Sequence, residues 1–166
     1  RYLPVYTQVW EWLNAGKIGE VRLMSSSFCS NMPRDNADRW FNSELAGGAL
    51  LDMGIYNVNL SQWVFQQDPE SIAALGYVGA TNVDEQVSVV MHYGQGRISQ
   101  FATGLTVQAS NDVFIYGSSG YIHILPHLCV PTEAILCVEG ETEQHVSAPL
   151  RANGYEYEIE EAVRCI

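Results

Sequence analysis

The sequence is poor in positive charge and in long apolar runs. It has 8 Lys and Arg against 19 Asp and Glu, which gives a formal net charge of −11 at pH 7. Because such a surface repels phosphate backbones, we expect no nucleic-acid partner. The longest apolar stretch, residues 45–65, is interrupted by polar residues between Asp52 and Gln62. It is therefore a poor membrane span, and we expect no membrane association either.

Paired cysteines are also missing. The four cysteines form no CxxC pair and show no spacing typical of a disulfide framework: Cys29, Cys129, Cys137 and Cys165. This usage predicts reduced thiols in a cytoplasmic protein, and a Cys129–Cys137 disulfide is the alternative. The sequence starts at Arg1 without a signal peptide, and its last residues still follow a helical pattern. We therefore expect a fragment of a longer protein.

A third absence concerns the phosphate-binding turn of dinucleotide folds. No strand–GxGxxG–helix unit occurs in the chain. The glycines of "GYVGA" and "YGSSGY" lie between strand patterns and have the spacing of turns. This chain alone is therefore not expected to bind a nicotinamide cofactor tightly.

The first part of the chain combines helical and strand patterns. Pro4 and a helical apolar spacing predict a helix that ends at Gly16, and alternation predicts a strand within residues 19–31. A polar loop follows, and the apolar segment 46–65 predicts a second helix.

From residue 70 onward the pattern changes to short β-rich runs separated by glycine turns, until residues 153–166 return to helical spacing. The 166 residues suffice for one domain with a sizeable core. We predict a single α+β domain over residues 1–166, with a large open, mainly antiparallel sheet and two to three helices packed on one face. The prediction includes no Rossmann domain.

The second predicted helix raises a question, because it carries an acid and a phenol in an otherwise apolar segment. Asp52 and Tyr56 are four residues apart, so a helix places them on one face, where their oxygens can converge on one ligand. A phenol can donate a proton to a carbonyl oxygen, and an adjacent group can lower its pKa. The alternative is that Asp52 interacts with the helix dipole and Tyr56 is a core aromatic with a satisfied hydroxyl.

Two features just before this helix have equally open interpretations. The glycines Gly47 and Gly48 let the backbone approach either a ligand or a neighbouring element. Arg39 and Trp40 lie on the polar loop, where binding residues are frequent. Arg39 is either a contact to a cofactor or polyhydroxylated substrate, or a solvated surface arginine.

The other polar groups favour structural roles. His123 and His127 lack a third ligand of fitting spacing, so we predict no metal site. Asp84 and Glu85 are interpreted as a turn and a solvated strand start. The acidic residues near the end are interpreted as a solvated helix face: Glu156, Glu158, Glu160 and Glu161.

Several motifs, in this order, resemble the Gfo/Idh/MocA oxidoreductases, in particular their dihydrodiol-dehydrogenase-like branch. They are "GKIGEVR", "RWFNSELAGGALLDMGIY", "VDEQVSVVMHYGQG", "IYGSSGYI" and "NGYEYEIEEAVRCI", and together they span nearly the whole chain. "AGGALLDMGIY" is the most specific of them. The resemblance is to the C-terminal domain of these enzymes, which follows an N-terminal dinucleotide-binding domain that is absent from this sequence.

The resemblance implies roles for four residues. Asp52 and Tyr56 match the Asp and the His or Tyr that family members carry on this helix, and are implied as catalytic. Arg39 and Trp40 match more loosely an Arg–aromatic pair that is implied to contact the cofactor, NAD or NADP. A catalytic Lys, in a Glu-Lys-Pro motif of the N-terminal domain, has no counterpart here.

The resemblance thus implies hydride transfer to or from a sugar-like or cyclic polyol or dihydrodiol substrate in the intact protein, and an inactive isolated chain. A non-catalytic sugar-binding or assembly module is the alternative. Because few helices are available to cover six or more strands, we also expect a homodimer through the sheet.

Overall fold

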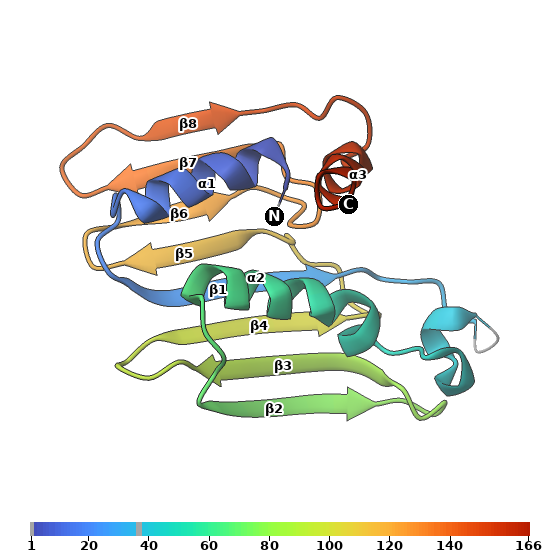
Figure 1. Ribbon diagram of the computed structural model, residues 1–166. Coiled ribbons are helices and arrows are strands. Elements are labelled where there is room, and N and C mark those ends of the chain that lie inside the picture. The colour runs from blue at the N-terminus through green and yellow to red at the C-terminus, as the bar shows by residue number, and fades with distance from the viewer. Residues whose placement is uncertain (1, 36–37) are drawn as a thin grey trace.

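The computed structural model describes residues 2–35 and 38–166 of the chain. One eight-stranded sheet forms its centre, with the strand order β2-β3-β4-β1-β5-β6-β7-β8 (Figure 1). The strands are β1 (Val21–Cys29), β2 (Ser71–Val78), β3 (Asp84–His92), β4 (Ile98–Gly104), β5 (Val113–Gly117), β6 (Gly120–Ile124), β7 (Glu133–Val138) and β8 (Gln144–Ser147).

All neighbouring strands are antiparallel except β1 and β4, which are parallel. The predicted open, mainly antiparallel sheet is therefore confirmed, with one parallel pair at its centre. This pair arises because β1 lies between two sets of consecutive strands and joins them into one sheet.

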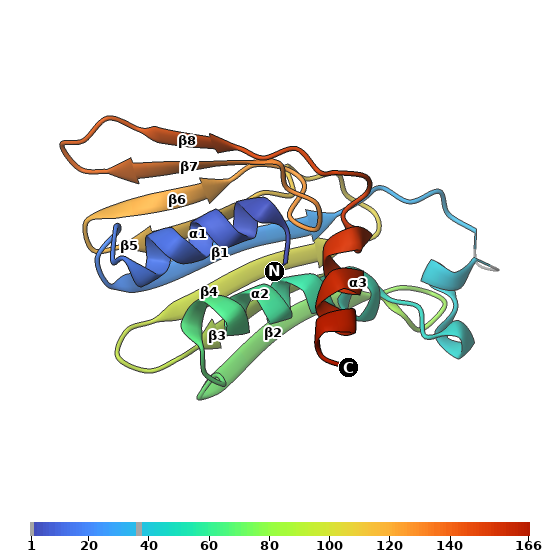
Figure 2. The same cartoon turned by 45° about the horizontal axis from the view of Figure 1, so that its top comes forward.

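Two helices cover one face of the sheet. Helix α1 (Pro4–Asn14) lies over the β5–β7 side and α2 (Ile55–Phe65) over β1 and β4, while α3 (Tyr155–Arg164) stands at one end of the sheet, beside the start of α2 (Figures 1 and 2). Within the described residues no helix covers the opposite face. No described helix is both long and apolar enough to cross a bilayer.

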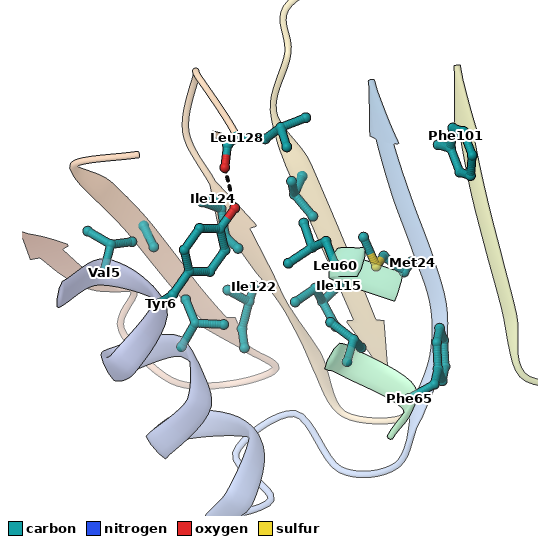
Figure 3. Packing of buried hydrophobic residues seen from close by; sticks show 14 of the residues in the cluster. Val5, Tyr6, Met24, Leu60, Phe65, Phe101, Ile115, Ile122, Ile124 and Leu128 are labelled. Atoms are coloured by element: carbon teal, nitrogen blue, oxygen red, sulfur yellow. Dashed lines mark hydrogen bonds between the residues drawn. The ribbon is translucent and has the colours of Figure 1, made fainter. Parts of the chain in front are cut away.

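The main core fills the space between these helices and the sheet. On β3, Val87, Val89 and Met91 are buried while the residues between them are exposed, as expected for a strand with one covered face. Tyr6 of α1 lies in this core and donates a hydrogen bond to the Leu128 carbonyl (Figure 3). This bond satisfies a buried phenol, which is otherwise costly to bury.

Buried polar contacts fix α2 on the sheet. Ser26 of β1 donates to Asn57 over 2.8 Å, and the hydroxyls of Ser61 and Ser99 are 2.6 Å apart, the latter on β4. Because each buried hydroxyl has a specific partner, these contacts set the position of the helix along the strands.

The second predicted helix starts later than expected. It begins with a π-helical segment, η3 (Leu50–Gly54), that continues into α2, whereas residues 46–48 are not helical. Gly48 has φ +122°, which no helix accommodates. Two short 3₁₀ turns precede it, η1 (Arg39–Phe41) and η2 (Ser43–Leu45).

Candidate functional site

Three of the four predicted site residues meet at the carboxylate of Asp52. The Arg39 guanidinium donates to Oδ1 of Asp52, and the Trp40 indole Nε1 donates to Oδ2 over 2.8 Å. The Asp52 side chain is only 19% exposed, whereas that of Arg39 is 53% exposed. Asp52 is thus a partly buried carboxyl group with two hydrogen-bond donors, which offset the cost of burying it.

The glycines before the helix make this arrangement possible. The amide of Gly47 donates to the Asn42 carbonyl over 2.9 Å, and that of Gly48 to the Trp40 carbonyl over 3.0 Å. A Cβ on Gly47 would lie 2.5 Å from the Arg39 carbonyl oxygen. Of the two interpretations of these glycines, the structure supports close packing against neighbouring backbone.

The ring of Tyr56 packs against that of Phe28. The two rings meet edge to face at a centroid distance of 5.4 Å, and Tyr56 remains 47% exposed. Partial burial raises the pKa of its phenol, and the nearby Cys129, Tyr155, Asp52 and Glu158 raise it further. The phenol is therefore protonated at neutral pH and can act as a proton donor.

A cleft of about 690 Å³ opens beside Tyr56. The loop at residues 128–130, residues at the starts of α1 and α3, and one side of α2 from Ile55 to Trp63 form its walls. Tyrosines supply much of the lining, namely Tyr2, Tyr6, Tyr56 and Tyr155. Asn59, Asn153 and Glu158 add polar side chains, which gives apolar walls with a few hydrogen-bonding groups. Asp52 is not part of this lining, so it lies beside the cleft rather than in it.

β3 begins at Asp84, so the predicted strand start is confirmed, but the interpretation of Glu85 as solvated is wrong. Glu85 is 2% exposed and accepts two hydrogen bonds from Arg34, over 2.9 and 2.7 Å. Asp84 accepts a hydrogen bond from the Leu50 amide over 2.6 Å. Their partners lie more than 30 residues away, so a local pattern could not reveal them.

The remaining polar candidates have local partners. Nε2 of His123 lies 2.9 Å from Oδ2 of Asp112, and no group of three or more described His, Cys, Asp or Glu residues is placed to hold a metal ion. All four cysteines are free thiols. In the acidic C-terminal run, Glu156 accepts hydrogen bonds from backbone amides at the start of α3, and Glu160 pairs with Arg151. That face is therefore only partly a solvated surface.

Comparisons with known proteins give a consistent result. A family model described as the GFO/IDH/MocA C-terminal domain matches residues 6–123. Trans-1,2-dihydrobenzene-1,2-diol dehydrogenase from Xenopus laevis is 31% identical over 174 aligned residues, which cover 100% of this chain and 52% of that protein. The human protein of that name is also 31% identical, with 51% of its length covered. The chain thus spans about half the length of the curated relatives it matches.

Solved structures share the fold at low sequence identity. An aldose-aldose oxidoreductase from Caulobacter crescentus, complexed with glycerol, superimposes with a TM-score of 0.85 at 18% identity, over 99% of this chain and 51% of that chain. KijD10, a 3-ketoreductase from Actinomadura kijaniata in complex with NADP and TDP-benzene, gives a TM-score of 0.81 at 20% identity, over 99% and 51% of the two chains.

Proposed function

Because the chain belongs to the Gfo/Idh/MocA family of oxidoreductases, we propose that it is the substrate-side half of an NAD(P)-dependent dehydrogenase or reductase. Its substrate is a sugar-like compound or a cyclic polyol or dihydrodiol. One observation carries the proposal: Tyr56 presents a protonated phenol at the edge of a tyrosine-lined cleft, one helical turn from Asp52. An assembly module has no need for this combination.

The described residues fit only part of a nicotinamide cofactor site. Arg39 is half exposed beside Asp52, so its remaining N–H donors can reach a phosphate or ribose, and Trp40 lies next to it. No described turn has the glycine pattern that cradles phosphates, so most of the cofactor must be held by a dinucleotide-binding half. When bound, the nicotinamide gives or accepts the hydride.

Tyr56 moves the proton that accompanies the hydride. In reduction its phenol donates to the carbonyl oxygen of the substrate, and in oxidation the phenolate takes the proton from the substrate hydroxyl. The groups that act on Tyr56 in this half all raise its pKa. We therefore expect a cation of the dinucleotide-binding half to lower this pKa for oxidation near neutral pH. Asp52, held by Arg39 and Trp40, orients this end of the site or binds a substrate hydroxyl.

The cleft suits a small ring that carries hydroxyl groups. Tyrosine rings can pack on its apolar faces, while Asn59, Asn153 and Glu158 can hydrogen-bond its hydroxyls. Similarity to enzymes named for a dihydrodiol and for aldoses supports this substrate class. The four free thiols support a reducing, cytoplasmic location.

Exposed apolar side chains on the outer side of the helix support the presence of a covering half. Leu51 is 66% exposed and Ile55 is 48% exposed, next to Tyr56. A contiguous exposed apolar surface typically marks an interface. We expect the isolated chain to be inactive and to bind NAD or NADP more weakly than micromolar, which isothermal titration calorimetry would test.

The open sheet face supports a homodimer. Pairing with β3 places Leu75 and Tyr77 of β2 on the face opposite the helices, and both are highly exposed. Phe114 and Tyr116 of β5 form stacked rings on the same face. We expect light scattering at micromolar concentration to give twice the chain mass. Leu75→Arg should give monomers, and Leu51→Arg, on the helix side, should leave the dimer intact. A wild-type monomer would contradict this part of the proposal.

The decisive experiment is Tyr56→Phe in the complete protein, with its dinucleotide-binding half. Phenylalanine keeps the edge-to-face contact with Phe28 but removes the proton donor, so kcat should fall about 10²- to 10⁴-fold. Tyr121→Phe, on the far face of the sheet, is the matched control and should leave kcat unchanged. NADP- and NAD-linked assays across sugars and dihydrodiols provide the readout. A wild-type protein without such activity would favour the non-catalytic sugar-binding or assembly alternative.

A further inference from the structure

Two consecutive carboxylates at the start of β3 connect the sheet to both parts of the candidate site. Asp84 is bonded to the first residue of η3, and Glu85 is bonded to the loop that precedes η1. Neither contact is needed to form β3 itself, because strand pairing uses backbone groups. Both contacts instead act on segments that carry site residues.

Asp84 holds the turn from which Asp52 projects. Its Oδ2 accepts the Leu50 amide over 2.6 Å, and Asp52 follows two residues later. A free amide at the start of a helix favours a negative acceptor. Gly48 leaves room for this carboxylate, since a Cβ there would lie 2.2 Å from Oδ1 of Asp84. On the other side, the Thr103 hydroxyl donates to the Ala49 carbonyl over 3.2 Å.

Glu85 holds the loop that carries Arg39 and Trp40. Its carboxylate is buried and paired with both terminal nitrogens of Arg34, a geometry that fixes direction as well as distance. The Arg34 guanidinium lies over the Phe41 ring, 5.3 Å from its centroid. Phe41 is the last residue of η1, so Arg34 links the sheet directly to the turn that carries Arg39 and Trp40.

Phe41 also connects η1 to the start of the second long helix through apolar packing. It is fully buried in a small second core with Ala49, Met53 and Leu105. Met53 belongs to η3, so the same cluster joins η1 to the helix start. The turn η1 is thus held through Phe41 by both the Arg34 guanidinium and apolar packing.

We propose that Asp84 and Glu85 are positioning residues for the active site. Asp84 sets the start of the helix that carries Asp52 and Tyr56, and Glu85 sets, through Arg34, the position of Arg39. The inference rests on the proposed function for its kinetic consequences, but the hold on the loop is a property of this chain alone. Breaking the Glu85 contact should raise KM for the cofactor, and breaking the Asp84 contact should lower kcat.

The loop can be tested without any assay of activity. Arg39 is a trypsin site at the start of η1, whereas Arg22 and Arg97 lie on or beside the sheet. In the complete protein, Glu85→Gln should speed cleavage after Arg39 about tenfold or more, because the ion pair between the buried Glu85 carboxylate and the half-exposed Arg34 guanidinium is lost. Cleavage after Arg22 and Arg97 should not change. Glu133→Gln, an exposed change of the same kind, should behave as wild type.

Kinetics on the same proteins test positioning itself. Glu85→Gln should raise KM for the cofactor about tenfold with a smaller change in kcat. Asp84→Ala should lower kcat about tenfold, and Asp84→Asn, which keeps an acceptor for the Leu50 amide, should restore most of it. A general loss of stability would not raise mainly KM in Glu85→Gln and lower mainly kcat in Asp84→Ala. If Glu85→Gln unfolds, Arg34→Lys, which keeps the charge but only one contact, should show the same pattern more weakly.

Each outcome decides the proposal. Unchanged cleavage after Arg39 in Glu85→Gln would overturn it, as would faster cleavage in an active enzyme with unchanged KM and kcat. Equal effects of Asp84→Ala and Asp84→Asn would overturn the role of Asp84. If the wild-type protein shows no dehydrogenase activity, the proposed function fails, and the tryptic result alone decides whether Glu85 holds the loop.

Discussion

Replacing Trp40 by phenylalanine removes one hydrogen bond from the Asp52 carboxylate and keeps an aromatic ring in place. The bond is a 2.8 Å contact from Nε1 to a carboxylate whose side chain is 19% exposed. Hydrogen bonds to charged groups contribute about 1.5–3 kcal/mol, and the residual exposure places this one near 1.5 kcal/mol. The second contact of Asp52 involves Arg39, whose side chain is 53% exposed. Solvent screening reduces this pair to about 0.5 kcal/mol.

Double-mutant cycles separate these two contributions. Asp52→Ala is combined with Trp40→Phe in one cycle and with Arg39→Ala in another, and free energies of unfolding are measured in urea. The coupling energy to Trp40 should be about three times that to Arg39. In 1 M salt the Arg39 coupling should largely vanish, while the Trp40 coupling persists. Trp10→Phe should show no coupling to Asp52, because Trp10 packs on Trp63 instead.

The result that refutes this reasoning is a reversal of the order. If Arg39 couples to Asp52 more strongly than Trp40 does, burial does not set the strength of these contacts. Equal couplings that both vanish in salt would mean that the carboxylate is solvated, and Asp52 would then be free to bind a substrate hydroxyl directly.

Two further predictions concern stability. Gly48→Ala should lower the free energy of unfolding by about 2 kcal/mol or more, because φ +122° is strained for alanine and its Cβ would meet Asp84. Thermal unfolding measures this loss, and an unchanged stability would contradict the prediction. For Asp112, partial burial works to raise the carboxyl pKa, but hydrogen bonds from Ser110 and His123 outweigh it and hold the pKa below its usual value. Since a lowered folded-state pKa stabilises the protein above the unfolded-state pKa of about 4, Asp112→Asn should be less stable than wild type at pH 6. The difference should shrink as the pH falls below about 4, and urea titrations at several pH values would show whether it does.

Local patterns predicted most of the elements because each depends on neighbours in sequence. The helix at Pro4, the strands after residue 70 and the last helix follow from apolar spacing and turn glycines. The start of the second long helix was predicted several residues too early. Helix propensity alone would start this helix at Ala46. The backbone of Gly48 and the hydrogen bond from the Leu50 amide to the Asp84 carboxylate instead start it at Leu50.

The candidate site divides in the same way. Asp52 and Tyr56 stand out as polar residues at helical spacing in an apolar segment, and the sequence alone shows this contrast. Their different surroundings are not, because Asp52 meets Arg39 and Trp40 whereas Tyr56 meets Phe28 and the cleft. The cleft joins residues at the starts of α1 and α3, one side of α2 and the loop at residues 128–130, which are far apart in the chain.

By itself the sequence determined the class of fold, the helix that carries the acid and the phenol, and the strongly acidic composition. These features depend on local spacing or on average composition. Only the tertiary structure decided that Asp84 and Glu85 are anchors. The sequence does not distinguish a solvated glutamate from one that is buried and paired with Arg34, as Glu85 is. The physical difference between them is the loss of solvent and the arrival of a partner 51 residues away, and folding alone brings these two changes together.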